Sequence, residues 1–451
     1  MHSYIHKGLS FLAIVLCIAF FAPRAEAQTA GNCVYGKAEK YLDVNNVRAR
    51  ILNVGGLFWN GDPNVYTVPK GGAAEAIFAG GIWLSGITEG DNKLRMAAAT
   101  YGTWEFWPGP LDANGNPPAD CSTYDRIYKV SLTDITTLNE TGVATSDLAE
   151  WPWQIGAPVK DGDGNPNNYD ITKGDRPDMI GDQMIWWVMN DVGNAHKRTS
   201  TDPIGVEVQT TAFAFNQAGD LGNMTFYRTK IIYKGKSNLT ETMLSLWSDV
   251  DLGDSSDDYL GVDTTLSLGY VYNSDENDGG DHGYGAAPPA IGYDFFQGPL
   301  VNGKRLGVTY FHYFLNGNPV CGDPAASSTE YRYAQTGRCR DGRRLSATGD
   351  GSSGNPPYSN FAFTGDPVTG RGWSEMNNNG AGGRSPNGDR RFVMSTGPWT
   401  MKPGEVQEIV YGIVWARAKT ALGSLAKLRL ADTKAQDLFN NNFVAPNPPD
   451  A

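Results

Sequence analysis

The stretch "IGVEVQTTAFAFNQAGDLGNMTFYRTKIIYKG", residues 204–235, decides the fold class of this chain. Two runs rich in β-branched and aromatic residues flank "NQAGDLGN", which has the Asn, Asp and Gly composition of a turn. This order predicts a pair of antiparallel strands. Apolar and polar residues alternate only roughly along the second run, which is typical of a sandwich strand covered on both faces.

Similar runs lie on both sides of this pair. "MIWWVMND" (184–191) precedes it, and "TETMLSLWSDVDLG" (240–253) follows through "KGKSNL" (234–239), so we predict an antiparallel meander. Two more strands are predicted around a turn at Pro403-Gly404. The 55 glycines of the 451-residue chain indicate many turns. The sequence therefore predicts a mainly β protein, an antiparallel β-sandwich-like architecture with long loops.

A helix is predicted near the end of the chain. Ser424 has the character of an N-cap, and an apolar stripe that includes Leu425, Leu428 and Leu430 follows it at helical spacing. The β-rich region spans residues 28–443. The sequence leaves open whether this region is one unit or two subdomains with a break near residues 150–180.

The first 27 residues have the pattern of a secretory signal peptide. Lys7 precedes an apolar run, and Ala25-Glu26-Ala27 matches a cleavage site before Gln28. The run is shorter than the roughly 20 residues of a membrane span, and no later run is longer. We therefore expect export to the extracellular space or the outer cell surface, with no transmembrane segment after cleavage. The net charge of −12 argues against nucleic acid as a partner.

Four cysteines remain after signal cleavage, an even number that predicts two disulfides in an exported chain. Sequence alone allows three pairings. We favour Cys33–Cys121 and Cys321–Cys339, because each pair lies within one half of the chain.

The stretch "WSDVDLGDSSDDYLGVD" (247–263) contains six aspartates and no Lys or Arg, with apolar residues between the acidic ones. Ca²⁺ takes six to eight oxygen ligands, often from Asp side chains in an irregular loop. Two alternatives remain open: a solvated acidic loop, and a carboxylate pair for glycoside hydrolysis. The predicted Ca²⁺ ligands in this stretch are Asp249, Asp251, Asp257, Asp258 and Asp263.

A second stretch, "DGDGNPNNYD" (161–170), places Asp161, Asp163 and Asn165 at positions 1, 3 and 5 of a calcium loop, with Asp170 beyond. The Gly and Glu that an EF-hand requires at positions 6 and 12 are missing. This stretch predicts a loop-type Ca²⁺ site, with a connector built from Asx turns as the alternative.

Motifs for catalysis are scarce. Only His196, His282 and His312 remain after signal cleavage, and the chain has no H-E-x-x-H, G-x-S-x-G or P-loop pattern. We therefore expect no catalysis. The alternative is a carbohydrate-binding or glycoside-hydrolysing protein that uses Asp pairs and stacking on Trp and Tyr, although tryptophans in such runs more often form the core.

Several phrases in combination resemble the N-terminal region of large secreted or surface proteins of Bacteroidota and their relatives. That resemblance implies export by type IX secretion. Such chains typically continue into fibronectin type III or similar modules and a C-terminal sorting signal, which this chain lacks, and the group has no agreed catalytic residues. The ending "VAPNPPDA" (444–451) has the composition of a linker to missing downstream modules. The phrases include "IFAGGIWLSGI", "GDQMIWWVMNDVGNAH", "NMTFYRTKII", "DLGDSSDDYLGVDTTLSLGYVYN" and "PPAIGYDFFQGP".

The expected function combines these features. We expect a secreted or cell-surface structural or adhesion module of a larger extracellular protein, stabilised by Ca²⁺. Its expected partners are an extracellular glycan or protein surface and the downstream modules of the same full-length chain.

Overall fold

The computed structural model describes residues 28–445, apart from residues 60, 62–64 and 326. The predicted signal peptide and residues 446–451 of the predicted linker lie outside the described residues. Two large sheets dominate, and every strand pairing within them is antiparallel, which confirms the predicted sandwich-like class.

The first sheet has ten strands. In spatial order these are β23 (Tyr310–Leu315), β26 (Arg390–Met401), β15 (Leu239–Asp249), β6 (Ala79–Thr88), β3 (Gly56–Leu57), β2 (Arg48–Leu52), β4 (Tyr66–Thr67) and β5 (Glu75–Ile77), with β1 (Glu39–Leu42) on β2 and β7 (Lys93–Ala98) on β6.

The second sheet has nine strands. In spatial order these are β16 (Asp258–Asp263), β17 (Leu268–Asn273), β20 (Ala290–Gln297), β27 (Val406–Ala416), β14 (Met224–Tyr233), β13 (Val206–Ala214), β12 (Gln183–Asn190) and β8 (Trp107–Pro108), with β9 (Tyr128–Ser131) on β12.

Smaller elements cover the sheets or connect their strands. The two-stranded hairpins are β10 (Val159–Lys160) with β11 (Arg176–Pro177), β18 (Asn277–Asp278) with β19 (Gly285–Ala286), β21 (Leu300–Val301) with β22 (Lys304–Arg305), and β24 (Leu345–Ser346) with β25 (Tyr358–Ser359). The helices are α1 (Leu132–Thr141), α2 (Ser146–Ala149), α3 (Ser328–Gln335) and α4 (Ala421–Asn440), and short 3₁₀ turns span Cys121–Tyr124, Trp153–Ile155, Ile171–Lys173 and Leu221–Asn223.

The core explains why the central strands are apolar on both sides. In β12, Ile185 and Trp187 face the other sheet, whereas Trp186 and Val188 pack into a second cluster on the outer face. Side chains alternate between the two faces of a strand, so a strand covered on both faces needs a nearly continuous apolar run. The run "MIWWVMN" is therefore a consequence of two-sided burial.

The connection after β14 differs from the predicted meander. Strands β12, β13 and β14 are neighbours in the nine-stranded sheet, as predicted. The turn "KGKSNL" instead carries the chain to β15, which pairs with β6 and β26 in the other sheet. Turn composition marks where a strand ends, but it does not determine which sheet receives the next strand.

Helix α4 packs on the outer face of the nine-stranded sheet through Leu425, Leu428 and other apolar residues. Its N-cap is Thr420, whose hydroxyl accepts the Gly423 N–H, so the predicted N-cap at Ser424 was wrong. Leu430 is 66% exposed and does not belong to the buried stripe. The helix begins one turn earlier than the sequence suggested, with Ser424 buried on its inner face.

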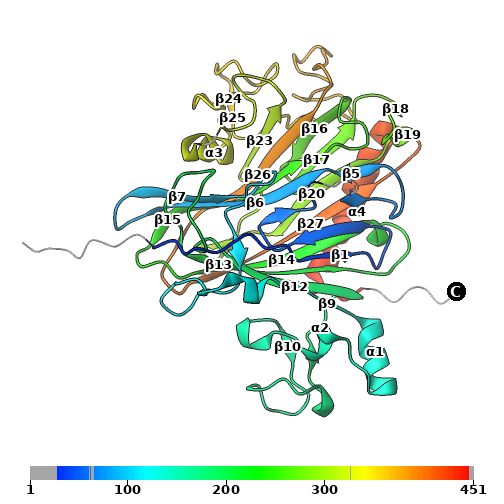
Figure 1. Ribbon diagram of the computed structural model, residues 1–451. Helices are drawn as coiled ribbons and strands as arrows, with labels where there is room; N and C mark the ends of the chain where they lie inside the picture. Colours follow the sequence, from blue (N-terminus) through cyan, green and yellow to red (C-terminus); the bar gives the residue numbers. More distant parts are fainter. Residues whose placement is uncertain (1–27, 60, 62–64, 326, 446–451) are drawn as a thin grey trace, which may run out of the picture.

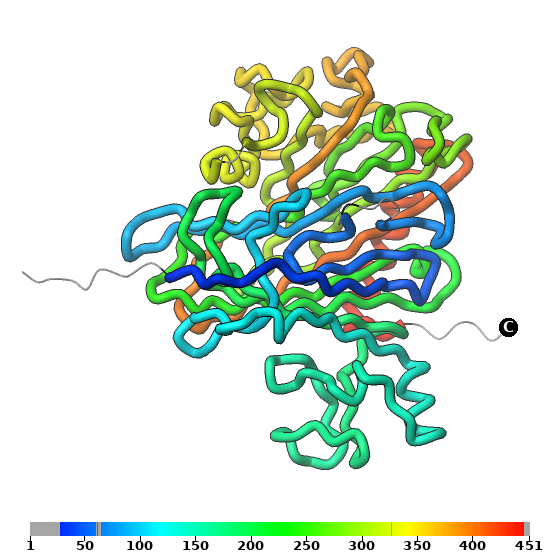
Figure 2. The backbone as a smooth tube through the Cα atoms, in the orientation of Figure 1, coloured from blue at the N-terminus to red at the C-terminus, as the bar shows by residue number. Residues whose placement is uncertain are grey.

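The two ends of the molecule are built from loop-rich segments. Figures 1 and 2 show α1, α2 and β10 at one end, and α3, β24 and β25 with the neighbouring loops at the other. Both disulfides form as favoured, with Cα–Cα distances of 5.4 Å for Cys33–Cys121 and 4.6 Å for Cys321–Cys339. In the described part of the chain, no helix combines the length and the apolar character that a membrane crossing requires.

Candidate metal centre

The acidic stretch leaves the ten-stranded sheet at Asp249, the last residue of β15, which is paired in register with Arg391 of β26. The chain then turns sharply, because Asp251 adopts a left-handed φ of 42° and Gly253 a φ of 83°. A Cβ at position 253 would lie 1.9 Å from Oδ2 of Asp278, so only glycine fits there. This turn directs the Asp251 side chain back toward the strand end.

Three aspartates meet at this strand end. Asp249, Asp251 and Asp389 each place a carboxylate oxygen within 4.8 Å of the other two, and we call this group the three-aspartate cluster. Each side chain has a buried Oδ1 that receives no hydrogen bond. Oxygens bound to the same Ca²⁺ each lie about 2.3–2.6 Å from it, so they are separated by at most about 5 Å. The spacing in the cluster fits that limit.

The other side of the cluster is held by one arginine. Tyr101 donates its hydroxyl hydrogen to Oδ2 of Asp249, and Nε of Arg391 donates to the Tyr101 oxygen at 2.7 Å. The Arg391 guanidinium also lies 3.3 Å from Oδ1 of Asp249, 3.3 Å from Asp323 and 3.1 Å from Asp389. With Asp251 included, four carboxyl groups share one guanidinium, so the centre is short of positive charge.

The pKa values reflect this shortage. Burial, and then the charge of Asp251, raise the pKa of Asp249 well above its ordinary value. Burial, and then the charge of Asp389, raise the pKa of Asp251 to about 6. Arg391 works against both rises without cancelling them. A bound cation would favour the ionised form of every carboxyl group in the cluster.

The cluster is open to solvent through Asp251. This residue lines a pocket of about 310 Å³ in which four carboxylates, one imidazole and one phenyl ring meet. An ion therefore has a route to the buried oxygens. The side chains that line this pocket include Glu75, Phe78, Asp251, Asp254, Asp281 and His282.

The remaining predicted ligands of the acidic stretch lie outside the cluster. Asp258 is fully buried and accepts the Leu252 N–H at 3.1 Å, while its Oδ1 has no donor. Asp257 accepts the side-chain amide of Asn273 at 2.7 Å. Asp263 forms an ion pair of 3.5 Å with Arg429 of α4, so the structure does not bring it to the cluster.

The second predicted site, at residues 161–170, has a different character. Asp161, Asp163 and Asp175 lie within 4.8 Å of one another, but backbone N–H groups already donate to each of these side chains. Asp161 accepts from Asp163 and Gly164 at 3.0 and 2.7 Å, and Asp175 accepts from Gly162 and Asp170 at 2.8 and 2.7 Å. These backbone hydrogen bonds lower the pKa of Asp175.

The other two predicted ligands of that loop are local caps. Asn165 accepts the Asn167 N–H at 3.2 Å, and Asp170 accepts the Thr172 N–H at 3.0 Å at the start of a 3₁₀ turn. These contacts have the geometry of Asx turns, the alternative that the sequence left open.

Sequence reasoning missed Asp389 and Asp175. Asp389 follows a long stretch rich in Gly and Asn and joins the cluster only because β26 pairs with β15. Its one local signal is its position directly before a strand. Asp175 lies just beyond the 161–170 stretch and is 1% exposed.

Aromatic side chains give the carbohydrate alternative little support. Most tryptophans belong to the core, and among the described residues no Trp or Tyr lines the pocket at Asp251. Trp59 and Tyr101 meet edge to face at 5.8 Å near the cluster, and Tyr101 is already bound to Asp249. The tryptophans at most 9% exposed are Trp83, Trp107, Trp151, Trp186, Trp187, Trp247, Trp373, Trp399 and Trp415.

Comparison of the sequence with protein-family models and with curated proteins found no match. The geometry of the site and the sequence features described above therefore carry the functional proposal.

Proposed function

We propose that this chain is an exported structural or adhesion module whose fold is stabilised by Ca²⁺ at the three-aspartate cluster. The observation that carries the proposal is the meeting of Asp249, Asp251 and Asp389, which bring carboxylate oxygens within 4.8 Å of one another and each have a buried Oδ1 without a hydrogen bond. Buried polar atoms nearly always have a partner, and unpaired anionic oxygens are especially costly. A cation at this point would remove that cost.

The chemistry of the donors favours a hard cation. All three are carboxylate oxygens, and no sulfur or imidazole belongs to the cluster. Ca²⁺ accepts such ligands in irregular geometry and completes its shell with water, whereas Mg²⁺ demands near-ideal octahedral geometry. The pocket beside Asp251 gives solvent access for those waters.

The location of the cluster supports a structural role. Asp249 ends β15, Asp389 precedes β26, and Asp251 begins the loop that leads to β16 of the other sheet. An ion bound by all three would tie that loop to the end of the β15–β26 pair. The cluster would then act as a cross-link between segments that are distant in sequence.

The proposed setting is extracellular. The signal-peptide pattern and the two disulfides support export, because disulfides persist in oxidising compartments. The resemblance to surface proteins of Bacteroidota supports attachment to further modules and export by type IX secretion. A glycan or protein surface is the proposed partner of the assembled protein.

Thermal unfolding tests the metal proposal. The protein starting at Gln28 is melted in chelator, in excess Ca²⁺ and in excess Mg²⁺. At a hundredfold excess over Kd, Ca²⁺ should stabilise the fold by about 2.7 kcal/mol, and Mg²⁺ should do less. Asp389→Asn should remove most of the Ca²⁺ response.

The matched control is Asp163→Asn, in the loop whose carboxylates are already hydrogen-bonded; it should keep the response. A melting curve that ignores both chelator and Ca²⁺ would overturn the proposal. The same holds if Asp389→Asn responds as strongly as the unmodified protein.

A further inference from the structure

His196 occupies an unusual position between the two sheets. Its side chain is fully buried, with Nδ1 2.7 Å from the carbonyl oxygen of Met96 in β7 and Nε2 2.7 Å from the carbonyl oxygen of Asp191, directly after β12. A backbone carbonyl can only accept a hydrogen bond, so each ring nitrogen needs its own hydrogen. A neutral imidazole carries only one, and the second short contact would then place two lone pairs against each other.

The side chain of Asp191 supplies the opposite charge. It is also fully buried, and Oδ2 lies 3.7 Å from Nε2 of His196. Its oxygens accept backbone N–H groups from Ile204, Gly205 and Val206 at 2.5, 3.0 and 2.8 Å. Burial raises the pKa of Asp191, and the charge of His196 and these three donors oppose that rise. Because both oxygens already accept hydrogen bonds, the geometry fits a carboxylate better than a carboxylic acid.

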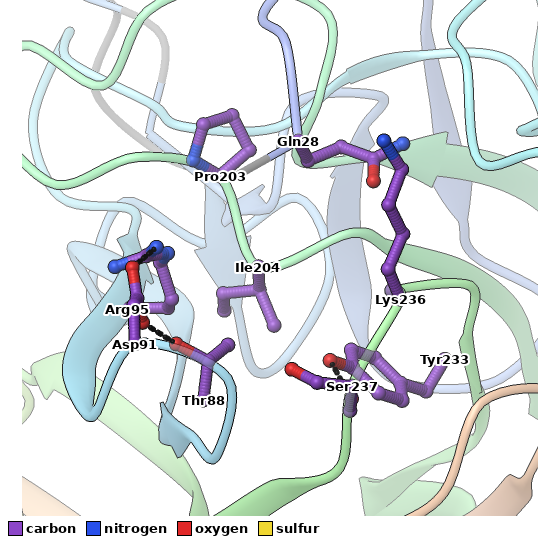
Figure 3. Close-up of a pocket in the computed structure, with 10 residues that line it drawn as sticks. Gln28, Thr88, Asp91, Arg95, Pro203, Ile204, Tyr233, Lys236 and Ser237 are labelled. Carbon is purple, nitrogen blue, oxygen red and sulfur yellow. Dashed lines mark hydrogen bonds and ion pairs between the residues drawn. The ribbon is translucent and has the colours of Figure 1, made fainter. Parts of the chain in front are cut away.

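Other charges near this pair have partners of their own. Arg95 of β7 donates a hydrogen bond to Asp91 at 2.6 Å and lies 3.6 Å from Asp202. Figure 3 shows Arg95 and Asp91 beside Ile204. Tyr233, on the other side of Ile204, is a neutral phenol because burial and the charge of Asp191 raise its pKa to about 12.

The loop that carries His196 also contains Arg198 and Thr199. Their backbone N–H groups donate to the Glu105 carboxylate at 2.7 and 2.8 Å. The Arg198 guanidinium donates to the Tyr331 hydroxyl at 2.8 Å. Within the described residues, His196 is thus the basic side chain within ion-pair distance of Asp191.

We propose that His196 is a buried imidazolium cation that joins the ten-stranded sheet to the nine-stranded sheet in the folded protein. One N–H binds β7, the other binds the end of β12, and the charge balances Asp191. The ring also stacks on Trp107 at 5.9 Å, and Trp107 packs against the Cys33–Cys121 disulfide. The doubly protonated ring therefore links the two sheets, and through Trp107 it also contacts the N-terminal segment. Its loss would break one link and leave Asp191 without a counter-charge.

Nuclear magnetic resonance of the protein starting at Gln28, with ¹⁵N-labelled histidine, tests this inference. The protein then contains three histidines, and the measurement is made at about pH 8, above the ordinary imidazole value of about 6.5. Both ring nitrogens of His196 should carry slowly exchanging hydrogens. His312 provides a buried neutral reference, because burial lowers its pKa to about 3. The exposed ring of His282 reports on solvent conditions in the same sample.

A spectrum in which one His196 nitrogen lacks a hydrogen would overturn the inference. Asp191→Asn keeps the size of the side chain but removes the counter-charge. In this variant, one ring nitrogen of His196 should lack its hydrogen at the same pH. If that variant folds and His196 remains doubly protonated, Asp191 is not what holds the charge. If the variant fails to fold, the spectrum of the unmodified protein still decides the charge state.

Discussion

Replacing Asp251 by Asn should stabilise the protein without calcium and weaken its response to calcium. In the unmodified protein the folded state holds a proton on Asp251 up to about pH 6, whereas the unfolded chain releases it near 3.8. When folding raises the pKa of a group, the protein loses stability as the pH rises from the unfolded pKa to the folded pKa. Above pH 6, the ionised Asp251 carboxylate lowers the free energy of unfolding by a constant amount.

The size of that cost follows from the shift. A difference of about two pH units at 1.36 kcal/mol each amounts to about 3 kcal/mol. Asn has a similar size and no charge, so Asp251→Asn removes this penalty at pH 8. The amide loses some of the polar contacts of the carboxylate, which leaves an expected net gain of about 1–3 kcal/mol in chelator.

Calcium should reduce the stability advantage of the variant. Ca²⁺ in hundredfold excess over Kd stabilises the unmodified protein by about 2.7 kcal/mol. The variant lacks one of three charged ligands, so its Ca²⁺ affinity should fall at least tenfold. Urea unfolding at pH 5 and pH 8, with chelator and with Ca²⁺, gives the four free energies needed for each protein.

Two results would refute this reasoning. A variant that is less stable than the unmodified protein in chelator at pH 8 would show that Asp251 is stabilised as an anion without metal. A variant with an unchanged Ca²⁺ response would show that Asp251 is not a ligand. At pH 5, between the two pKa values of Asp251, about half of the penalty is present, so the two proteins should differ about half as much in chelator, and this serves as the internal control.

Three further predictions concern other parts of the fold. The buried guanidinium of Arg390 lies 2.8 Å from the Glu375 carboxylate. Glu375→Gln removes this charged partner and should lower the free energy of unfolding in urea by about 3–5 kcal/mol. A loss below about 1 kcal/mol, the size measured for surface ion pairs, would contradict this prediction. Thiol titration of the unfolded, unreduced protein should find no free thiol, and selective loss of Cys321–Cys339, which closes an 18-residue separation, should lower stability by about 3 kcal/mol. Burial raises the pKa of Asp432 to about 7, so stability should fall by about 3 kcal/mol between pH 4 and pH 7 through this group, and Asp432→Asn should flatten that part of the pH profile; an unchanged profile would contradict the assignment.

Local patterns in the sequence predicted the elements better than their partners. The apolar run in β12 and the Pro403-Gly404 turn gave strands where the structure has them. Ser131 starts helix α1 with a capping box to Asp134. These features depend on residues close together in the chain, so their signals are local.

Tertiary choices were harder to predict. The "KGKSNL" turn has hairpin composition, yet β15 crosses to the other sheet, where β6 and β26 bury both of its edges. Ser424 has N-cap chemistry, but the helix begins a turn earlier, because Thr420 can cap it while the Ser424 hydroxyl donates to the Pro288 carbonyl at 2.7 Å. In both cases the packing of distant segments decided between local options of similar quality.

The acidic stretch shows why composition alone could not define the site. Its aspartates look equivalent in sequence, but the fold gives them separate roles. Asp263 pairs with Arg429, Asp257 binds an asparagine amide, and Asp249 and Asp251 turn toward Asp389. An oxygen that already has a donor gains less from a cation than an oxygen that has none. For this reason the three-aspartate cluster, rather than the whole acidic stretch or the better-spaced loop at residues 161–170, is where a calcium ion would contribute most to stability.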